Sequence, residues 1–284
     1  MSLSAFPYPG GKTYHIDEIL PYFPDHERYV EPFGGSAALL LNKQPSHIEV
    51  LNDLDHDVVH FYRVVRERRE ELQAWLRAVP YSRALHDRWG RAFFEGYRPE
   101  DDIERAGRWF YLRYTQYSGK LNGISGFKAS TTRSEPDRFR NAIDDLDDVV
   151  DRLRGVTLEC LSYTEIVEKY DRPGTFFYFD PPYVGPGDNL YRHDGAFDHG
   201  ELVRTLERIQ GKWICSYGDL PDALEHAVDH RDWHTRQYRI HYTINGDERE
   251  KATERLVMNF DPDEVPRFRC PQQTGLEVYG GERR

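Results

Sequence analysis

The chain has 284 residues, a net charge of −11 and an aromatic content of 14%. A chain of this length and aromatic content can bury a sizeable core, which excludes intrinsic disorder. Its three cysteines, Cys160, Cys215 and Cys270, form no Cys-x-x-Cys pair. This argues against a metal site or a disulfide framework and indicates a reducing compartment. Because neither a signal-like start nor a long apolar run is evident, we expect a cytoplasmic protein without membrane contact.

The charge is unevenly distributed along the chain. Residues 61–140 contain 17 Lys and Arg against 11 Asp and Glu, a local balance of +6 within an acidic protein. Such a segment fits either one face that meets a polyanion or a solvated helical surface, and charge alone does not decide between them.

The first 55 residues predict a strand, a glycine turn, a helix and a second strand. Residues 28–33 predict a short strand that ends at Pro32, and residues 37–43 predict a helix with Ser36 as its N-cap. Residues 47–51 predict the second strand. This βαβ unit implies a parallel sheet and therefore an α/β fold.

The middle of the chain is predicted to be a helical insertion. Apolar residues recur mainly at spacings of three or four from Asp55 to about Val79, which favours a helix there. Further helices are expected near 84–94, 102–117 and 137–153, with a polar, basic loop over 118–136.

Strands return in the last part of the chain. The predicted strands are 156–160, 175–179 and 213–217, and the predicted helices are 163–170 and 198–209. Asp198 and Glu201 resemble a capping box at the start of the second helix. Residues 233–244 and 255–260 predict an antiparallel pair joined through the turn-prone Asn245-Gly246-Asp247.

Asp180-Pro181-Pro182-Tyr183 directly follows a predicted hydrophobic strand. Ligands of open α/β sheets bind at the carboxyl ends of strands, so Asp180 lies where a site is expected. A carboxylate and a stiffly held carbonyl accept both N–H groups of an adenine amine and aim its lone pair, while an aromatic ring stacks on the extruded base. The alternative is a turn that ends the strand above a buried tyrosine.

Residues 30–36, Val-Glu-Pro-Phe-Gly-Gly-Ser, place a glycine turn between a strand and a helix. The glycines let the backbone approach a ligand closely, and Asp53 follows 19 residues after Gly34, about where a ribose-binding acid stands in nucleotide folds. The absence of G-x-G-x-x-G disfavours a hydride-transfer enzyme. A cofactor with a ribose but no pyrophosphate fits this turn, and a purely structural turn is the alternative.

Gly11-Lys12-Thr13 resembles the end of a phosphate-binding loop. That motif needs a glycine at position 6, where this chain has Phe6, so an NTPase is excluded. A glycine pair, an aromatic and a cation remain, which alone is more often a plain turn than a site.

Residues 110–128 interleave basic and aromatic side chains and run into a glycine-rich loop. This pattern suits contacts to phosphates and bases. A helix that packs its tyrosines on the core explains the residues before Tyr117 equally well.

Together these stretches resemble the Dam-type (D12 class) DNA adenine methyltransferases. That family places a Gly-Gly-Lys element first, then a Pro-Phe-x-Gly cofactor loop, an acidic strand end, a helical target-recognition insertion and Asp-Pro-Pro-Tyr. This sequence keeps the same order from Phe6 to about Phe260. The resemblance implies a Rossmann-like, S-adenosylmethionine-dependent methyltransferase sheet with helices on both faces and an inserted helical domain.

The resemblance also implies a division of the chain. Residues 1–59 and 156–266 would form the catalytic core, 60–155 the insertion that recognises DNA, and 267–284 a C-terminal tail.

By the same resemblance, the cofactor is S-adenosylmethionine. It would be bound by Tyr8, Gly10, Gly11, Lys12, Glu31, Pro32, Phe33, Gly34, Asp53 and Asp180. The catalytic group would be Asp180, Pro181, Pro182 and Tyr183. DNA would be contacted by Arg113, Tyr117, Lys120, Asn122 and Lys128. Two departures leave cofactor affinity open: Tyr8 stands where the family often has Trp, and the first stretch has an extra proline.

The implied reaction is direct methyl transfer to the N6 amine of adenine in duplex DNA after base flipping, with no metal and no catalytic cysteine. Double-stranded DNA is the implied partner, and a restriction endonuclease with the same recognition sequence is a further one. Two alternatives stay open: methylation of the cytosine N4 amine, where Ser more often replaces Asp180, and a DNA-binding protein without activity on the same fold.

Overall fold

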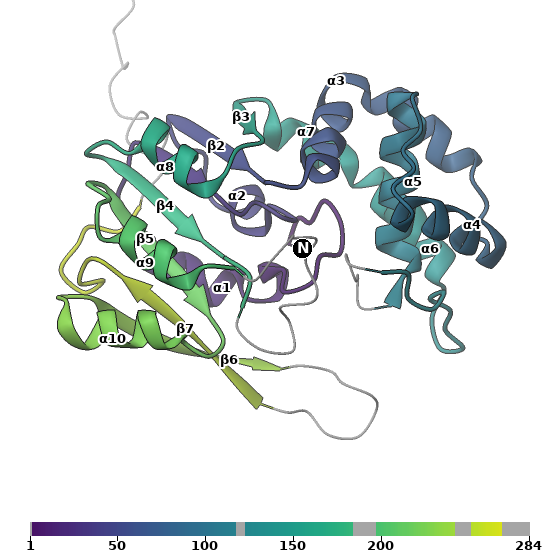
Figure 1. Cartoon of the computed structure of the whole chain (residues 1–284). Coiled ribbons are helices and arrows are strands. Elements are labelled where there is room, and N and C mark those ends of the chain that lie inside the picture. The colour runs from purple at the N-terminus through teal and green to yellow at the C-terminus, as the bar shows by residue number, and fades with distance from the viewer. Residues whose placement is uncertain (1, 118–122, 184–196, 242–250, 269–284) are drawn as a thin grey trace, which may run out of the picture.

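The computed structural model describes residues 2–117, 123–183, 197–241 and 251–268 (Figure 1). Its centre is a sheet in the order β3-β2-β1-β4-β5-β7-β6. The strands are β1 Arg28–Glu31, β2 Ile48–Asn52, β3 Val156–Glu159, β4 Thr175–Phe179, β5 Lys212–Tyr217, β6 His234–His241 and β7 Lys251–Met258. Neighbours from β3 to β5 pair in parallel, whereas β7 is antiparallel to both β5 and β6. The predicted α/β fold with a Rossmann-like sheet is confirmed.

The strand order reverses beside β1, which pairs with β2 on one side and with β4 on the other. The chain runs outward through β2 and β3, then returns to the centre at β4 and continues outward to β5. Such a reversal opens a crevice at the carboxyl ends of the two central strands. Glu31 ends β1 and Asp180 follows β4, so both are carried to the crevice.

Helices cover both faces of the sheet (Figure 1). One face carries α8 Tyr163–Tyr170, α9 His199–Leu206 and α10 Asp222–His230; on the other lie α1 Ile16–Ile19, α2 Ala38–Asn42 and the 3₁₀ turns Lys12–Tyr14 and Leu20–Tyr22. β4 shows why: Phe176 and Tyr178 enter one core, and Phe177 and Phe179 enter the other. Successive side chains of a strand point to opposite faces, so a fully apolar strand needs cover on both.

A helical segment lies between β2 and β3, beside the sheet (Figure 1). Its helices are α3 His56–Ala78, α4 Arg83–Phe94, α5 Asp102–Thr115, α6 Glu135–Asp144 and α7 Leu146–Leu153. Aromatic packing joins α3 to α5, where the rings of Phe61 and Phe110 stack at 5.3 Å. The predicted boundaries of the insertion, 60–155, remain a prediction.

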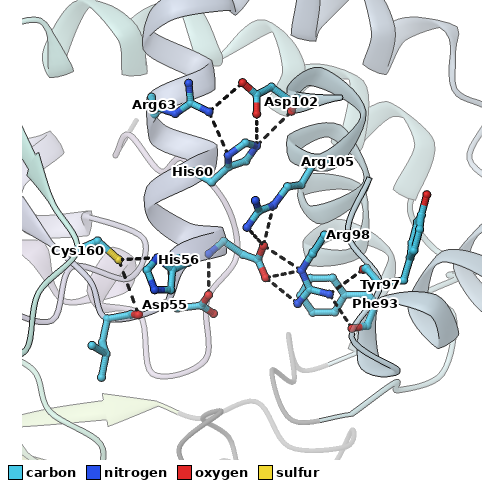
Figure 2. Close-up of polar contacts among 12 residues, drawn as sticks. Asp55, His56, His60, Arg63, Phe93, Tyr97, Arg98, Asp102, Arg105 and Cys160 are labelled. Atoms are coloured by element: carbon cyan, nitrogen blue, oxygen red, sulfur yellow. Dashed lines mark hydrogen bonds and ion pairs between the residues drawn. The ribbon is translucent and has the colours of Figure 1, made fainter. Parts of the chain in front are cut away.

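A buried ion cluster joins the start of α3 to Arg98 and to Arg105 of α5 (Figure 2). Asp55 caps α3 by accepting a hydrogen bond from the Asp57 amide at 2.8 Å. The buried Asp57 carboxylate accepts from Arg98 Nε at 2.8 Å and from Arg105 Nη2 at 2.9 Å. The Arg98 guanidinium lies 3.6 Å above the Phe93 ring. Burial opposes the charge of Asp57, but the two arginines outweigh it and hold the pKa of Asp57 below its usual value.

Two local predictions were wrong. Ser36 does not cap α2; the residue before the helix is Ala37, which has φ 53° and makes no side-chain cap. Gly35, at φ 46°, and Ala37 are both left-handed, and the turn that they form leaves Ser36 one residue before the capping position.

The helix predicted over 137–153 is two helices that meet at Asp145. The Gln73 side chain of α3 donates to the Ile143 carbonyl at 2.8 Å. The end of α6 is thus satisfied from outside, and α7 can pack in a new direction.

Three other elements differ from their predictions. The helix predicted to reach Tyr117 ends at Thr115, because Gln116 pairs with Phe127 in a β-bridge. α1 and α10 were not predicted. The predicted turn at 245–247 lies outside the described residues.

Within the described part of the chain, no helix has the length and apolarity that a membrane span needs. Nor do three or more His, Cys, Asp or Glu side chains gather there as a metal would require.

Candidate active site

A cavity of about 440 Å³ opens at the carboxyl ends of the central parallel strands. Ten predicted site residues line it: Tyr8, Gly11, Lys12, Glu31, Pro32, Phe33, Gly34, Asp53, Asp180 and Pro182. Gly10, Pro181 and Tyr183 adjoin these residues in the chain, so four segments distant in sequence converge here.

The glycine turn after β1 brings the backbone to the floor of this cavity. The Gly34 amide donates to the Asn52 carbonyl at 2.7 Å, which docks the turn on the end of β2. A Cβ atom at Gly34 would lie 2.8 Å from the backbone carbonyl oxygen of Asn52 and 2.5 Å from Leu51 Cδ1, so a side chain there would push the two strand ends apart. The tight turn predicted from sequence is therefore sterically required.

Asp53 stands beside the turn with both carboxylate oxygens engaged. Oδ2 accepts from the Gly35 amide at 2.8 Å and Oδ1 from the Asp55 amide at 2.8 Å. Burial raises the pKa of Asp53 to about 7, and the charge of Asp55 adds to the shift. These bonds orient the Asp53 carboxylate at the cavity, and its charge changes near neutral pH.

Glu31, at the end of β1, is a second buried carboxylate. Its Oε1 accepts from the Tyr29 hydroxyl at 2.6 Å and from the Leu40 amide at 2.8 Å. Burial raises the pKa of Glu31 to about 7, although both of these hydrogen bonds act in the opposite direction. A cationic ligand in the cavity would favour its ionised form.

Asp180 forms the centre of a buried ion pair. Lys12 Nζ lies 2.6 Å and 2.8 Å from the two oxygens of Asp180, and it also donates to the Gly10 carbonyl at 3.0 Å. The hydroxyls of Tyr183 and Ser216 donate to Asp180 Oδ1 at 3.2 Å and 3.0 Å. Burial raises the pKa of Asp180 above its usual value, against the pull of Lys12. The stretches Gly11-Lys12-Thr13 and Asp180-Pro181-Pro182-Tyr183, predicted as separate motifs, are thus joined by this ion pair.

An aromatic platform adjoins this pair. The ring of Tyr183 stacks on Tyr217 at 5.4 Å, and the Lys12 ammonium lies 5.0 Å from the Tyr183 ring centre. Stacked rings beside a hydrogen-bonding carboxylate are the surroundings that an extruded base requires.

Several site residues were missed in the sequence. Ser216, Glu254 and Tyr238 were not singled out as site residues. Other unpredicted residues line the cavity farther from Asp180: Leu54, Leu161, Ser162, Tyr163, Phe197 and Asp198. The rule that sites gather at parallel strand ends finds Leu161 and Ser162, which follow β3, and Ser216 near the end of β5. It does not find Glu254, because β7 is antiparallel.

The cavity residues fit S-adenosylmethionine. Carboxylates at Asp53 and Glu31 suit ribose hydroxyls and a cationic end, and Phe33, Leu54 and Leu161 offer apolar surface to a purine ring. The volume suits a nucleoside of this size.

The predicted DNA contacts are spread over the insertion. Tyr117 is 49% exposed and donates its hydroxyl to the Ala129 carbonyl at 3.0 Å. Lys128 lies half-buried near Glu135. Arg113 is 1% exposed with its guanidinium over the Trp109 ring, so this conformation does not present it to DNA. Lys120 and Asn122 lie outside the described residues.

The model of the D12 class N6 adenine-specific DNA methyltransferase family matches residues 8–242. The chain is 25% identical over 263 residues to the Type II methyltransferase M.CviBI of Paramecium bursaria Chlorella virus NC1A, covering 89% of this chain and 98% of that protein. It is 27% identical over 265 residues to the DNA adenine methylase of Escherichia coli, covering 88% and 93%.

Among solved structures, a precorrin 8W decarboxylase from Methanobacterium thermoautotrophicum matches with a TM-score of 0.39 and 10% identity, covering 92% of this chain and all of that one. Similarity this distant adds nothing to the sheet topology described above.

Proposed function

Because the chain belongs to the D12 class N6 adenine-specific DNA methyltransferase family, we propose that its target adenine leaves the duplex and is held at Asp180. The enzyme is an S-adenosylmethionine-dependent, site-specific methyltransferase that acts on the N6 amine of adenine in DNA. The proposal assigns this reaction to residues. The observation that carries it is the ion pair of Lys12 and Asp180, two residues that line the cavity.

Asp180 and the Pro181 carbonyl would accept the two N–H groups of the amine. An adenine amine is a weak nucleophile because its lone pair is delocalised into the ring. Two acceptors held on a stiff Pro-Pro loop bias the nitrogen toward tetrahedral geometry and aim the lone pair. Tyr183 would stack on the base, and Asp180 would take the proton that the nitrogen sheds after transfer.

The cofactor end would be held by the turn after β1 and by two carboxylates. S-adenosylmethionine supplies a methyl group made electrophilic by its sulfonium sulfur. Asp53 would bind the ribose, and Glu31, Phe33 and Gly34 would line the methionine end. Positioning of the donor and the amine contributes most of the acceleration, since orientation alone supplies roughly 7–11 kcal/mol.

The insertion, 60–155, would read double-stranded DNA, with the 117–128 segment as the contact element. The exposed side chain of Tyr117 and the partly exposed side chain of Lys128 support this assignment, whereas the side chain of Arg113 is buried. A basic segment in an acidic chain concentrates the attraction for phosphates on one part of the molecule.

A restriction endonuclease with the same recognition sequence is the partner we propose in the cell. The support is that M.CviBI, among the relatives, is named a Type II methyltransferase. The methylated DNA would then resist that endonuclease. A DNA substrate also supports the cytoplasmic location expected from the sequence.

Transfer of tritium from labelled S-adenosylmethionine to unmethylated duplex DNA, followed by nucleoside analysis, tests the residue assignment. We expect label in N6-methyladenine with the natural chain and a loss of about 10²–10³ in kcat with Asp180→Ala, the scale for removal of a group that stabilises the transition state. Asp229→Ala, an exposed aspartate of α10, is the matched control and should keep full activity. Wild-type activity in Asp180→Ala would refute the role of Asp180.

A further inference from the structure

Glu254 is a buried carboxylate that the proposed reaction leaves without a role. It lies on β7 and is 2% exposed. Tyr238, directly opposite on β6, donates its hydroxyl to the Glu254 carboxylate in a short hydrogen bond. On the site side, Glu254 Oε2 lies 3.9 Å from Lys12 Nζ. The antiparallel hairpin therefore brings a second negative charge to the Lys12–Asp180 pair.

The charges at this point are unequal. One ammonium faces two carboxylates, and Lys12 is only 3% exposed. Burial acts against its charge, yet Asp180 and Glu254 together hold the pKa of Lys12 well above its usual value. Lys12 thus stays protonated throughout the neutral range, and a buried ammonium must keep a carboxylate partner.

Asp180 cannot serve Lys12 and a target amine equally well. Lys12 contacts both of its oxygens, so an incoming N–H group must compete with an ammonium for the same acceptors. Ser216 and Tyr183 are fixed on a strand and on a stiff loop. Lys12 has a long, flexible stem, and a second carboxylate lies within reach.

We infer that Glu254 is a positioning residue for methyl transfer: it receives the Lys12 ion pair when the target amine occupies Asp180. This inference rests on the proposed role of Asp180. The exchange keeps the buried ammonium paired while Asp180 becomes a full-strength acceptor for the amine. Tyr238 holds the Glu254 carboxylate in place for the exchange.

Among the described residues, the polar groups around this exchange are Glu31 on β1, Tyr178 on β4, Tyr183 after β4, Ser216 on β5, Tyr238 on β6, and the His15 ring, which lies 5.5 Å from that of Tyr238. Burial raises the pKa of both Tyr178 and Tyr238, so these two hydroxyls stay neutral. The pKa of Asp180 is raised by burial, and the Glu254 charge adds to that shift.

Glu254→Gln tests the inference because it removes the charge and keeps the shape. We expect kcat to fall about tenfold to a hundredfold, the scale for partners that orient a reacting group, with KM for both ligands little changed. The acid limb of kcat/KM for DNA, measured at saturating S-adenosylmethionine so that Asp53 and Glu31 are already engaged, should move to lower pH by about one unit, because Asp180 loses a neighbouring negative charge. Loss of this charge alone would move the limb but leave kcat unchanged, so the inference requires both changes.

Glu225→Gln is the matched control: the same change at an exposed glutamate of α10, paired at 3.8 Å with Arg255. It should leave both kcat and the acid limb unchanged. Tyr238→Phe keeps the Glu254 charge but removes the hydrogen bond that holds its carboxylate in place. This variant should lower kcat less than Glu254→Gln does and should leave KM unchanged.

The outcomes separate the two proposals. If the natural chain does not methylate adenine, or if Asp180→Ala keeps its activity, the proposed role of Asp180 fails and the inference falls with it. If Asp180 is required but folded Glu254→Gln keeps the wild-type kcat, the inference alone is overturned, whether or not the acid limb has moved. A variant that melts early is measured below its melting temperature, where kcat still decides.

Discussion

Two of the ion clusters in the described part of the chain have opposite imbalances of charge. At the start of α3, one carboxylate, Asp57, faces the two cations Arg98 and Arg105. In the site, one cation, Lys12, faces the two carboxylates Asp180 and Glu254. The first cluster lowers the pKa of its carboxylate, whereas Asp180 in the second has a raised pKa.

This difference distinguishes the structural cluster around Asp57 from the reactive cluster around Lys12. Asp57 is ionised and saturated by its partners, so nothing further is required of it. Asp180 is kept closer to neutrality by burial, which suits a group that must exchange hydrogen-bond partners and hold a proton. Excess cation therefore marks the structural cluster, and excess carboxylate marks the chemical one.

Breaking the Asp57 cluster should give the largest effect on stability. Asp57→Asn leaves Arg98 and Arg105 without their carboxylate, and we expect the free energy of unfolding to fall by about 3 kcal/mol at pH 7. The folded-state pKa of Asp57 is lowered, so its stabilisation is present above its unfolded value and is lost as pH falls through the folded value. The gap between variant and natural chain should thus close in acid, as urea denaturation would measure.

The control for this variant is Asp151→Asn, whose ion pair with Arg154 is exposed. It should change the free energy of unfolding by less than about 0.5 kcal/mol. An equal loss of unfolding free energy in both variants would mean that the Asp57 cluster stabilises the fold no more than an exposed ion pair does.

The cofactor end sharpens the contrast through pH. Asp53 and Glu31 each have a pKa raised to about 7 by burial, so their ionisation costs the folded chain stability as pH rises from about 4 to 7. A ligand with a cationic end should favour their ionised forms and release up to about half a proton per group at pH 7. Affinity for S-adenosylmethionine should accordingly weaken below pH 7.

Calorimetry in two buffers of different ionisation heat measures this proton release. Asp53→Asn should reduce it, because one of the two titrating groups is gone. Equal binding heats in both buffers, with affinity constant from pH 6 to 8, would contradict the ionisation of these carboxylates on binding.

The smallest expected effect concerns the DNA surface. Lys128→Ala should lower the slope of log affinity against log salt by about 0.9, the contribution of one phosphate contact. Lys169→Ala, on α8 and paired with Glu159, is the control and should leave the slope unchanged. If both variants keep the wild-type slope, Lys128 is not a phosphate contact.

The centre of the site could be predicted from the sequence, because the rule that ligands bind at strand ends applies to parallel strands. Asp180 and Asp53 follow buried strands, and glycines at 34 and 35 mark a turn that has no room for a side chain. Lys12 was found by its motif, but its ion pair with Asp180 spans 168 positions and has no local signal. Glu254 gave none either, since its partner Tyr238 lies on another strand.

The helical insertion shows the other limit. Periodicity found α3, α4 and α5, because each buries an apolar stripe. It could not separate α6 from α7, since the break depends on Gln73 of a distant helix. Nor could it show that Arg113 points into the core, because an arginine beside aromatics reads equally well as a DNA contact.

Single-turnover methyl transfer by Asp180→Ala and Asp57→Asn, both with saturating DNA and cofactor and below their melting temperatures, tests the division between the two clusters most directly. Rapid quenching would give the rate of the chemical step alone. We predict that Asp180→Ala binds both ligands but loses the methyl-transfer step, while Asp57→Asn transfers at close to the wild-type rate. A normal chemical step in Asp180→Ala, or its loss in folded Asp57→Asn, would contradict the account.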